Sequence, residues 1–82
     1  MRVSVLLFGP QATLAGARSV DLAIEKEAPS VSDVLAALHE AAPALTGSLA
    51  SSRLAINHEF AAAEQTIRQG DEVALIGMVS GG

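Results

Sequence analysis

Apolar and polar residues follow two different periods along this chain. In Arg18–Glu25 they alternate, which predicts a half-buried strand with three aliphatic residues on its inner face. Aliphatic residues also fill Arg2–Phe8 until Gly9-Pro10 interrupts them. We therefore expect a second strand here, paired with the first as a hairpin.

A helical period begins after Pro29. Ser30 is a good N-cap, and Asp33 three residues later completes a shortened capping box. Apolar residues then recur within a stripe of about 100°, the width expected for a helix that lies on a sheet. The residues of this stripe are Val31, Val34, Leu35, Leu38 and Ala42. Pro43 is expected to end the helix.

The remaining segments are shorter. Residues 11–17 are interpreted as a connector with a short helical turn at its end, and residues 44–52 as an irregular connection of small residues. Strands are predicted over Arg53–Asn57 and Glu72–Ile76, and another short strand begins at Phe60. Ile67 is expected in the core.

The predicted order is therefore two strands, one helix and two or three further strands. A sheet with one helix on one face is an α+β architecture. In the β-grasp version, a mixed four- to five-stranded sheet packs on one main helix, and the first and last strands are central neighbours. We expect such a domain over residues 1–76 and a C-terminal tail over residues 77–82.

Composition excludes several classes of function. The chain has no cysteine, tyrosine or tryptophan, which excludes cysteine nucleophiles, cysteine-held metals and base stacking on those rings. Its net charge is −4, and its four arginines and single lysine are dispersed, so no nucleic-acid surface is expected. No apolar run approaches the ~20 residues that cross a membrane. We expect a cytoplasmic protein that itself binds no metal, cofactor, nucleic acid or membrane.

The last residues carry the chemistry. Val79, Ser80, Gly81 and Gly82 end the chain two residues after a predicted core strand. Because glycine has no Cβ, such a backbone can enter a channel too narrow for side chains. Residues 77–82 span about 20 Å when extended, enough to carry the Gly82 carboxylate into a partner's active site. Activated as an acyl-adenylate and attacked by sulfide, that carboxylate becomes a thiocarboxylate. The alternative is a frayed terminus without a role.

Strand parity predicts a docking surface. If the alternate aliphatic residues of the first strand point inward, Leu6 and Phe8 point outward, and the same rule points Ala74 and Ile76 outward. Phe60 follows a turn and is expected on this outer face. Together they predict an exposed apolar patch leading to the tail, as is typical of partner sites. The alternative is that the two phenylalanines close one end of the core.

Several motifs resemble those of the small subunits of molybdopterin synthase. The matching segments are Val5-Leu6-Leu7-Phe8-Gly9 with Leu14-Ala15-Gly16, Val34–Leu38, Ala55–Phe60, and Gly70–Ile76 with Val79–Gly82. The resemblance covers essentially the whole chain, and its C-terminal third is the most specific part. Where that family often has two prolines, this chain has Gly77-Met78, so its tail is expected to be less stiff.

The resemblance implies a ubiquitin-like β-grasp fold and a sulfur-carrier role in molybdenum cofactor biosynthesis. An E1-like adenylyltransferase would activate Gly82 with ATP and magnesium, and a sulfur donor protein would convert it to the thiocarboxylate. The tail would then enter the large subunit of molybdopterin synthase within a heterotetramer, where cyclic pyranopterin monophosphate receives two sulfurs to become molybdopterin. Phe8, Phe60 and Ile76 match the family's contact surface, to which Met78 is added. The chain would supply no catalytic side chain.

Other roles fit the same features. A sulfur carrier for thiamine thiazole or for tRNA thiolation would differ only in its partners. A ubiquitin-like modifier would join Gly82 to a lysine of another protein and produce isopeptide-linked species of higher mass. A plain β-grasp interaction module would keep its activity without Gly82.

Overall fold

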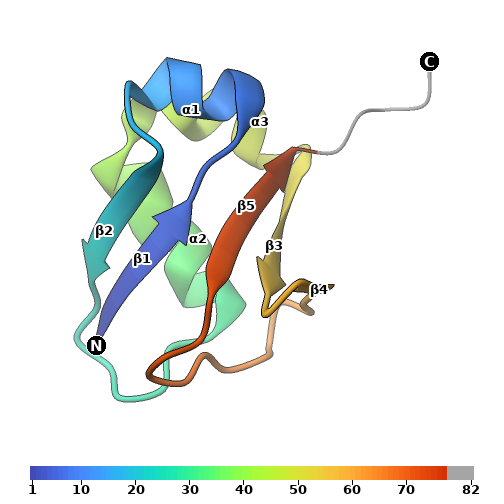
Figure 1. Ribbon diagram of the computed structural model, residues 1–82. Coiled ribbons are helices and arrows are strands. Elements are labelled where there is room, and N and C mark those ends of the chain that lie inside the picture. Colours follow the sequence, from blue (N-terminus) through green and yellow to red (C-terminus); the bar gives the residue numbers. More distant parts are fainter. Residues whose placement is uncertain (78–82) are drawn as a thin grey trace.

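Figure 1 shows the computed structural model, in which one long helix crosses one face of a five-stranded sheet and shorter helices lie at one end. The structure describes residues 1–77. The strands are β1 (Arg2–Leu6), β2 (Ser19–Ala23), β3 (Ser52–Ile56), β4 (Glu59–Phe60) and β5 (Val73–Gly77). The helical segments are α1 (Gly9–Ala15), α2 (Val31–Ala41), the 3₁₀ turn η1 (Pro43–Leu45) and α3 (Thr46–Leu49).

The strand order across the sheet is β2-β1-β5-β3-β4. β1 and β5 are parallel, whereas the β1–β2, β3–β5 and β3–β4 pairs are antiparallel. The first and last strands are thus central neighbours, which confirms the predicted α+β, β-grasp arrangement. Because β1 and β5 run in the same direction, their carboxyl ends meet at the same edge of the sheet.

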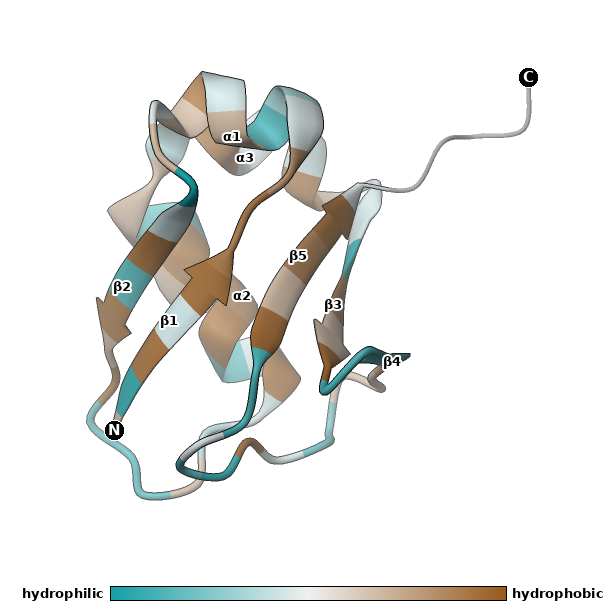
Figure 2. Cartoon of the chain, in the orientation of Figure 1, coloured by the Kyte–Doolittle hydropathy of each residue, from teal (hydrophilic) through white to brown (hydrophobic). Residues whose placement is uncertain are grey.

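The core lies between the sheet and α2. Val31, Val34 and Leu38 of the predicted helical stripe are buried, while Leu35 and Ala42 are partly buried at its margins. They pack against Leu7, directly after β1, and against the inward residues of the strands, which are Val3, Val5, Leu22, Leu54, Ile56, Val73 and Leu75. Figure 2 shows apolar segments along the neighbouring strands β1 and β5 and along α2 behind them, with hydrophilic loops near the N-terminus. Ile67 is only 1% exposed, as predicted.

The predicted cap of α2 is present. Ser30 Oγ accepts a hydrogen bond from the Asp33 N–H at 3.2 Å, and Asp33 Oδ2 accepts one from the Ser30 N–H at 2.9 Å. Lys26 Nζ lies 3.0 Å from Asp33 Oδ1. The Ser30 N–H, and after it Lys26, hold the pKa of Asp33 below its usual value because both favour the ionised carboxylate.

The prediction of an irregular connection over residues 44–52 is wrong, because η1 and α3 occupy most of it. Leu45 is fully buried and draws this segment onto the core. Two serine hydroxyls then bond back to the chain: Ser48 Oγ donates to the Leu45 carbonyl at 2.9 Å, and Ser52 Oγ to the Ser48 carbonyl at 2.7 Å. Small polar residues therefore order this segment instead of leaving it irregular.

Helix α1 extends the predicted short turn back to Gly9. Pro10 lies in its first turn, where backbone N–H groups have no partner within the helix, so the N–H that proline lacks costs no hydrogen bond. Gly16 ends the helix with a φ of 68°, a left-handed conformation that glycine adopts without a Cβ clash. At the other end of the chain, β5 includes Gly77, one residue beyond the predicted strand.

We expect Gly16→Ala to lower the free energy of unfolding by about 1–2 kcal/mol, because alanine is strained in the left-handed region. Gly77→Ala is the matched control. Its φ is not left-handed, and an added Cβ would meet the Gln11 side chain at an ordinary contact distance of 3.6 Å. It should be neutral, or stabilising by up to about 1 kcal/mol. Urea unfolding measures both, and equal losses would contradict this assignment.

Candidate functional site

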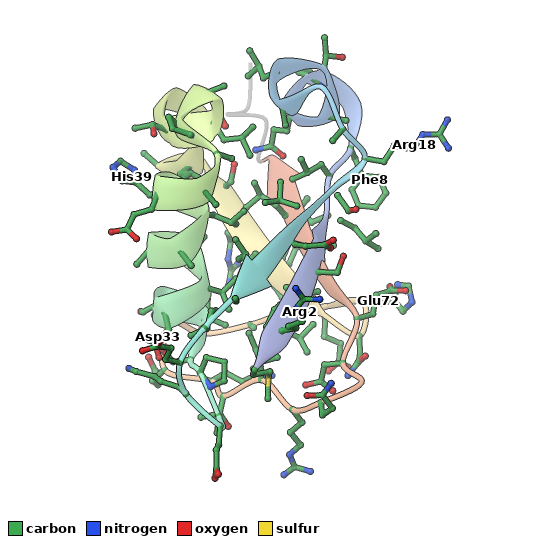
Figure 3. The ribbon with its side chains drawn as sticks, turned by 90° about the vertical axis from the view of Figure 1, so that its left-hand side faces the viewer. Arg2, Phe8, Arg18, Asp33, His39 and Glu72 are labelled. Carbon is green, nitrogen blue, oxygen red and sulfur yellow. The ribbon has the colours of Figure 1, made fainter. Side chains whose placement is uncertain are left out.

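An apolar patch lies on the face of the sheet that α2 leaves uncovered. The apolar patch comprises Phe8, Ala55, Phe60, Ala74 and Ile76, which line a hollow of about 300 Å³ together with His58 and Glu72. Figure 3 views the sheet from its β2 side, with the side chains of α2 to one side and Phe8 and Glu72 to the other. The structure thus brings together the three described residues that the sequence predicted as partner contacts. Leu6, also predicted to point outward, is partly buried and does not line this hollow.

Two alanines and two phenylalanines shape the hollow. Ala55 and Ala74 pair across β3 and β5, and each is only 8% exposed. Their short side chains form a floor, while Phe8 and Phe60 rise beside it with 54% and 50% of their surface exposed. Neither phenylalanine belongs to the buried core cluster. The alternative that they close one end of the core is therefore wrong, and the hollow can receive side chains of a partner.

Phe8 is held where β1 turns into α1. Its backbone is extended, and its carbonyl accepts hydrogen bonds from the N–H groups of Gln11 at 3.2 Å and Ala12 at 3.4 Å. The preceding residue, Leu7, is buried and donates its N–H to the Arg18 carbonyl at 2.8 Å. Anchored on both sides, Phe8 can present its ring to solvent without loosening the core.

Phe60 is positioned by the tight turn between β3 and β4. Asn57 and His58 both have left-handed backbones, with φ of 52° and 71°, as a two-residue hairpin turn requires. The Asn57 amide bonds to Asp71 Oδ1 at 3.0 Å and accepts the Glu72 N–H at 3.0 Å. The turn is therefore tied to the loop that precedes β5, and Phe60 keeps its place relative to Ile76.

Charged groups flank the apolar patch. The Arg53 guanidinium lies 4.8 Å from the centre of the Phe60 ring, within the range of a cation–π contact. On another side of the hollow, His58 Nε2 lies 3.2 Å from Glu72 Oε2, but these side chains are 84% and 47% exposed, so the pair contributes little to stability. Within residues 1–77 no group of histidine and acidic side chains could hold a metal ion. An aromatic–aliphatic surface with a charged rim suits recognition of another protein.

A second hollow adjoins the apolar patch at the end of β5. Phe8 and Ile76 line both hollows, and the second is completed by Gly9, Pro10, Gln11, Ser48, Ser51, Ser52 and Gly77. A third hollow lies away from both, around Met1, Lys26 and Arg68, and its charges are mixed. No described helix is long and apolar enough to cross a bilayer.

The predicted tail residues Met78, Val79, Ser80, Gly81 and Gly82 lie outside the described residues. Four residues at the site were not among the predicted contacts. They are Ala55 within the apolar patch and Arg53, His58 and Glu72 around it. Ala55 could have been found, because it alternates with two inward neighbours in its strand. The others could not, since their places depend on the hairpin turn.

Asp71 makes the turn beside the apolar patch sensitive to acid. The Arg68 N–H bonds to Asp71 Oδ2 at 2.8 Å, and this bond, followed by that of Asn57, holds the pKa of Asp71 below its usual value. A carboxyl whose pKa is lower in the folded state stabilises the fold above its unfolded pKa, and that contribution is lost as the pH falls through the folded pKa.

We therefore expect Asp71→Asn to flatten the acid dependence of stability. Between about pH 5 and pH 2, the free energy of unfolding of the wild type should fall more steeply than that of the variant, because only the wild type loses this ionised carboxylate. Urea unfolding at several pH values measures both curves. Parallel curves would show that Asp71 contributes nothing through its charge.

Comparison with known proteins places this geometry in a family. The ThiS family model matches residues 5–82. The crystal structure of SAMP1 from Haloferax volcanii is similar, with a TM-score of 0.81, 34% sequence identity and 100% of both chains covered. The solution structure of the small archaeal modifier protein 1 (SAMP1) from Methanosarcina acetivorans has a TM-score of 0.78 and 26% identity, covering 99% of this chain and 96% of that one. Among curated proteins no match was found.

One further structure shows the fold alone. A chain in the protein–protein complex of subunits 1 and 2 of molybdopterin-converting factor from Helicobacter pylori 26695 has a TM-score of 0.70 and 24% identity, with 100% of both chains covered. The ubiquitin-like β-grasp fold that the sequence motifs implied is confirmed by these structures, and the resemblance to small proteins of the ThiS and molybdopterin-converting type is confirmed by the family match. Since the family match spans nearly all of its residues, the chain belongs to the ThiS family.

Proposed function

We propose that the chain is the sulfur-carrier subunit of a molybdopterin synthase. The observation that carries the proposal is the course of β5, which brings Ile76 to the apolar patch and then reaches Gly77, directly before the sequence Met78-Val79-Ser80-Gly81-Gly82. The family match continues through residue 82. The last residues of the proposed docking surface and the diglycine segment therefore follow one another closely in the sequence.

The chemistry takes place at Gly82. An E1-like adenylyltransferase uses ATP and magnesium to convert its carboxylate into an acyl-adenylate, with release of pyrophosphate. Sulfide delivered by a donor protein attacks the carbonyl carbon, AMP leaves, and the thiocarboxylate remains. Each thiocarboxylate then gives its one sulfur to cyclic pyranopterin monophosphate in the active site of the large subunit, and hydrolysis returns the Gly82 carboxylate. Two loaded chains are therefore consumed for each molybdopterin formed. This chain supplies the group and its presentation, while its partners supply the catalytic side chains.

The apolar patch is the proposed contact for those partners. Phe8, Phe60 and Ile76 offer aromatic and aliphatic surface around a hollow, the kind of centre that dominates protein interfaces. Met78 would continue this contact along the tail. The Helicobacter pylori structure is a complex of subunits 1 and 2 of molybdopterin-converting factor, which supports a large subunit as the partner. We propose that the two kinds of subunit assemble as a heterotetramer.

A second candidate is a ubiquitin-like protein modifier. The chain is 34% identical to Haloferax volcanii SAMP1 over its whole length, and small archaeal modifier proteins are named for modification. The same adenylated Gly82 would then be attacked by a lysine amine of another protein, forming an isopeptide bond with release of AMP. Both candidates use the same patch and tail, so the acceptor of the activated carbonyl decides between them.

We expect deletion of Gly82 to abolish function. In a strain without its own molybdopterin synthase small subunit, the full chain should restore molybdenum-cofactor-dependent growth, and the truncated chain should not, because its terminal carboxylate, now on Gly81, ends one residue of about 3.5 Å short of the partner's reacting groups. Gly47→Ala is the control, since Gly47 has open space where a Cβ would lie and no left-handed φ. Growth restored by the truncated chain would refute the carrier chemistry.

Immunoblots of the same cells under denaturing conditions distinguish the candidates. Higher-mass species that depend on Gly82, without restored growth, favour the modifier. Restoration of thiamine synthesis or of tRNA thiolation in the corresponding deficient strains, instead of molybdenum-cofactor-dependent growth, would assign the same carrier chemistry to those pathways.

We expect Phe60→Ala to weaken binding to the large subunit by about 30-fold, the effect of losing an interface hot spot worth about 2 kcal/mol. The free energy of unfolding should fall by only about 1 kcal/mol, because half of the Phe60 ring is already exposed. Leu14→Ala is the control, since Leu14 is 54% exposed but lies outside the apolar patch. Calorimetric titration measures the affinities. Equal affinities for both variants would show that the apolar patch is not part of the interface.

A further inference from the structure

Gln11 is the one polar side chain buried within residues 1–77, with 6% of its surface exposed. Burying an amide costs free energy unless it is hydrogen-bonded. Gln11 Nε2 donates to Ser52 Oγ at 2.6 Å and lies 3.4 Å from Ser48 Oγ. Neither docking by the apolar patch nor chemistry at Gly82 explains why a polar group lies here.

The two serines determine how the Gln11 amide is oriented. Ser52 Oγ donates its hydrogen to the Ser48 carbonyl at 2.7 Å, and Ser48 Oγ donates its own to the Leu45 carbonyl at 2.9 Å. Each hydroxyl has one hydrogen, so both oxygens present only lone pairs toward Gln11. The NH₂ end of the amide must therefore face the serines. This links α1 to α3 and to the first residue of β3.

The same amide lies against Gly77, the last residue of β5. Gln11 Cδ, Nε2 and Oε1 are 3.6–3.7 Å from the position that a Cβ on Gly77 would take. Ser52, the hydrogen-bond partner of Gln11, is paired with Gly77 in the β3–β5 ladder. On the other side of β5, registered pairs with β1 end at Leu6 and Ala74, because β1 turns away toward α1. Gln11 thus packs beside the last residue of β5, at a position where β1 no longer pairs with that strand.

From these contacts we propose that Gln11 is a positioning residue that fixes the direction in which the chain leaves β5 at Gly77. Phe8 and Ile76 line both the apolar patch and the hollow that contains Gln11 and Gly77. The root of the tail is thereby held at a set place relative to the docking surface. The inference rests on the proposed carrier function, in which the Gly82 carbonyl must meet reacting groups that the partner holds in place. Misplacement by about 1 Å can cost about 100-fold in rate.

The test is Gln11→Met, which keeps a side chain of similar length but removes the donor to Ser52. Thr13→Ala in the same helix is the control, because the Thr13 hydroxyl bonds only to the Gly9 carbonyl among the described residues. If the methionine variant does not fold, Ser52→Ala removes the same bond from its other end. Two measurements are made on the full-length chain: the N–H residual dipolar coupling of Gly77, and kcat and KM for pyrophosphate release by an E1-like adenylyltransferase with ATP and magnesium.

We expect Gln11→Met to change the Gly77 coupling and to lower kcat about 10- to 100-fold, with KM retained because the apolar patch is intact. A merely structural role would not separate kcat from KM in this way. An unchanged Gly77 coupling overturns the inference whether or not the chain is a carrier. A changed coupling with an unchanged kcat also overturns it, because the direction of the chain at Gly77 would then not affect the reaction. This outcome counts only if adenylation of the wild type requires Gly82. Adenylation that persists without Gly82 is instead a failure of the proposed function, and the Gly77 coupling alone then decides the role of Gln11.

Discussion

The parallel pairing of β1 with β5 is the contact on which both the fold and the candidate site depend. It joins the two ends of the chain at the centre of the sheet and buries Val5, Val73 and Leu75 against α2. Since parallel strands point the same way, Phe8 after β1 and Ile76 near the end of β5 come to the same edge. One pairing therefore stabilises the core, brings the apolar patch together and sets where the tail begins.

The outer face of the sheet differs from the inner face in the size of its side chains. Inward positions of β3 and β5 carry leucine, isoleucine and valine, whereas the paired outward positions Ala55 and Ala74 carry single methyl groups. A floor of alanines beside two half-exposed phenylalanines leaves a hollow that the domain does not fill itself. Exposed aromatic surface is costly in water, and covering it with a partner recovers that free energy.

In the proposed function, the folded domain docks and the chain end reacts, which explains how such a small domain can take part in covalent chemistry. Within residues 1–77, Lys26 and Asp33 belong to the helix cap, Asp71 to the hairpin turn, and Arg53 and Glu72 to the rim of the patch. In the proposed function the reactive group belongs to the backbone, and the partner supplies activation and catalysis. The same domain therefore suits sulfur transfer and protein modification equally well, and the acceptor chosen by the partner determines which reaction follows.

Features that depend on local periodicity and composition follow from the order of the residues alone. Alternation predicted the strands, the 3.6-residue period and the Ser30–Asp33 cap predicted α2, and strand parity placed Phe8 and Ile76 on the outer face. These features could be predicted because side-chain direction in a strand or helix follows from spacing alone.

Features that join residues far apart in the chain, by contrast, emerge from the packing of the folded domain. Leu45 orders η1 and α3 because the core has room for it, and Asn57 fixes the hairpin because Asp71 and Glu72 lie beside it. Gln11 looks like an ordinary residue of a connector until folding places it between Ser52 and Gly77. Its hydrogen bond spans 41 residues, and no local pattern encodes a partner at that distance, because only the packing of α1 on the end of the sheet brings the two together.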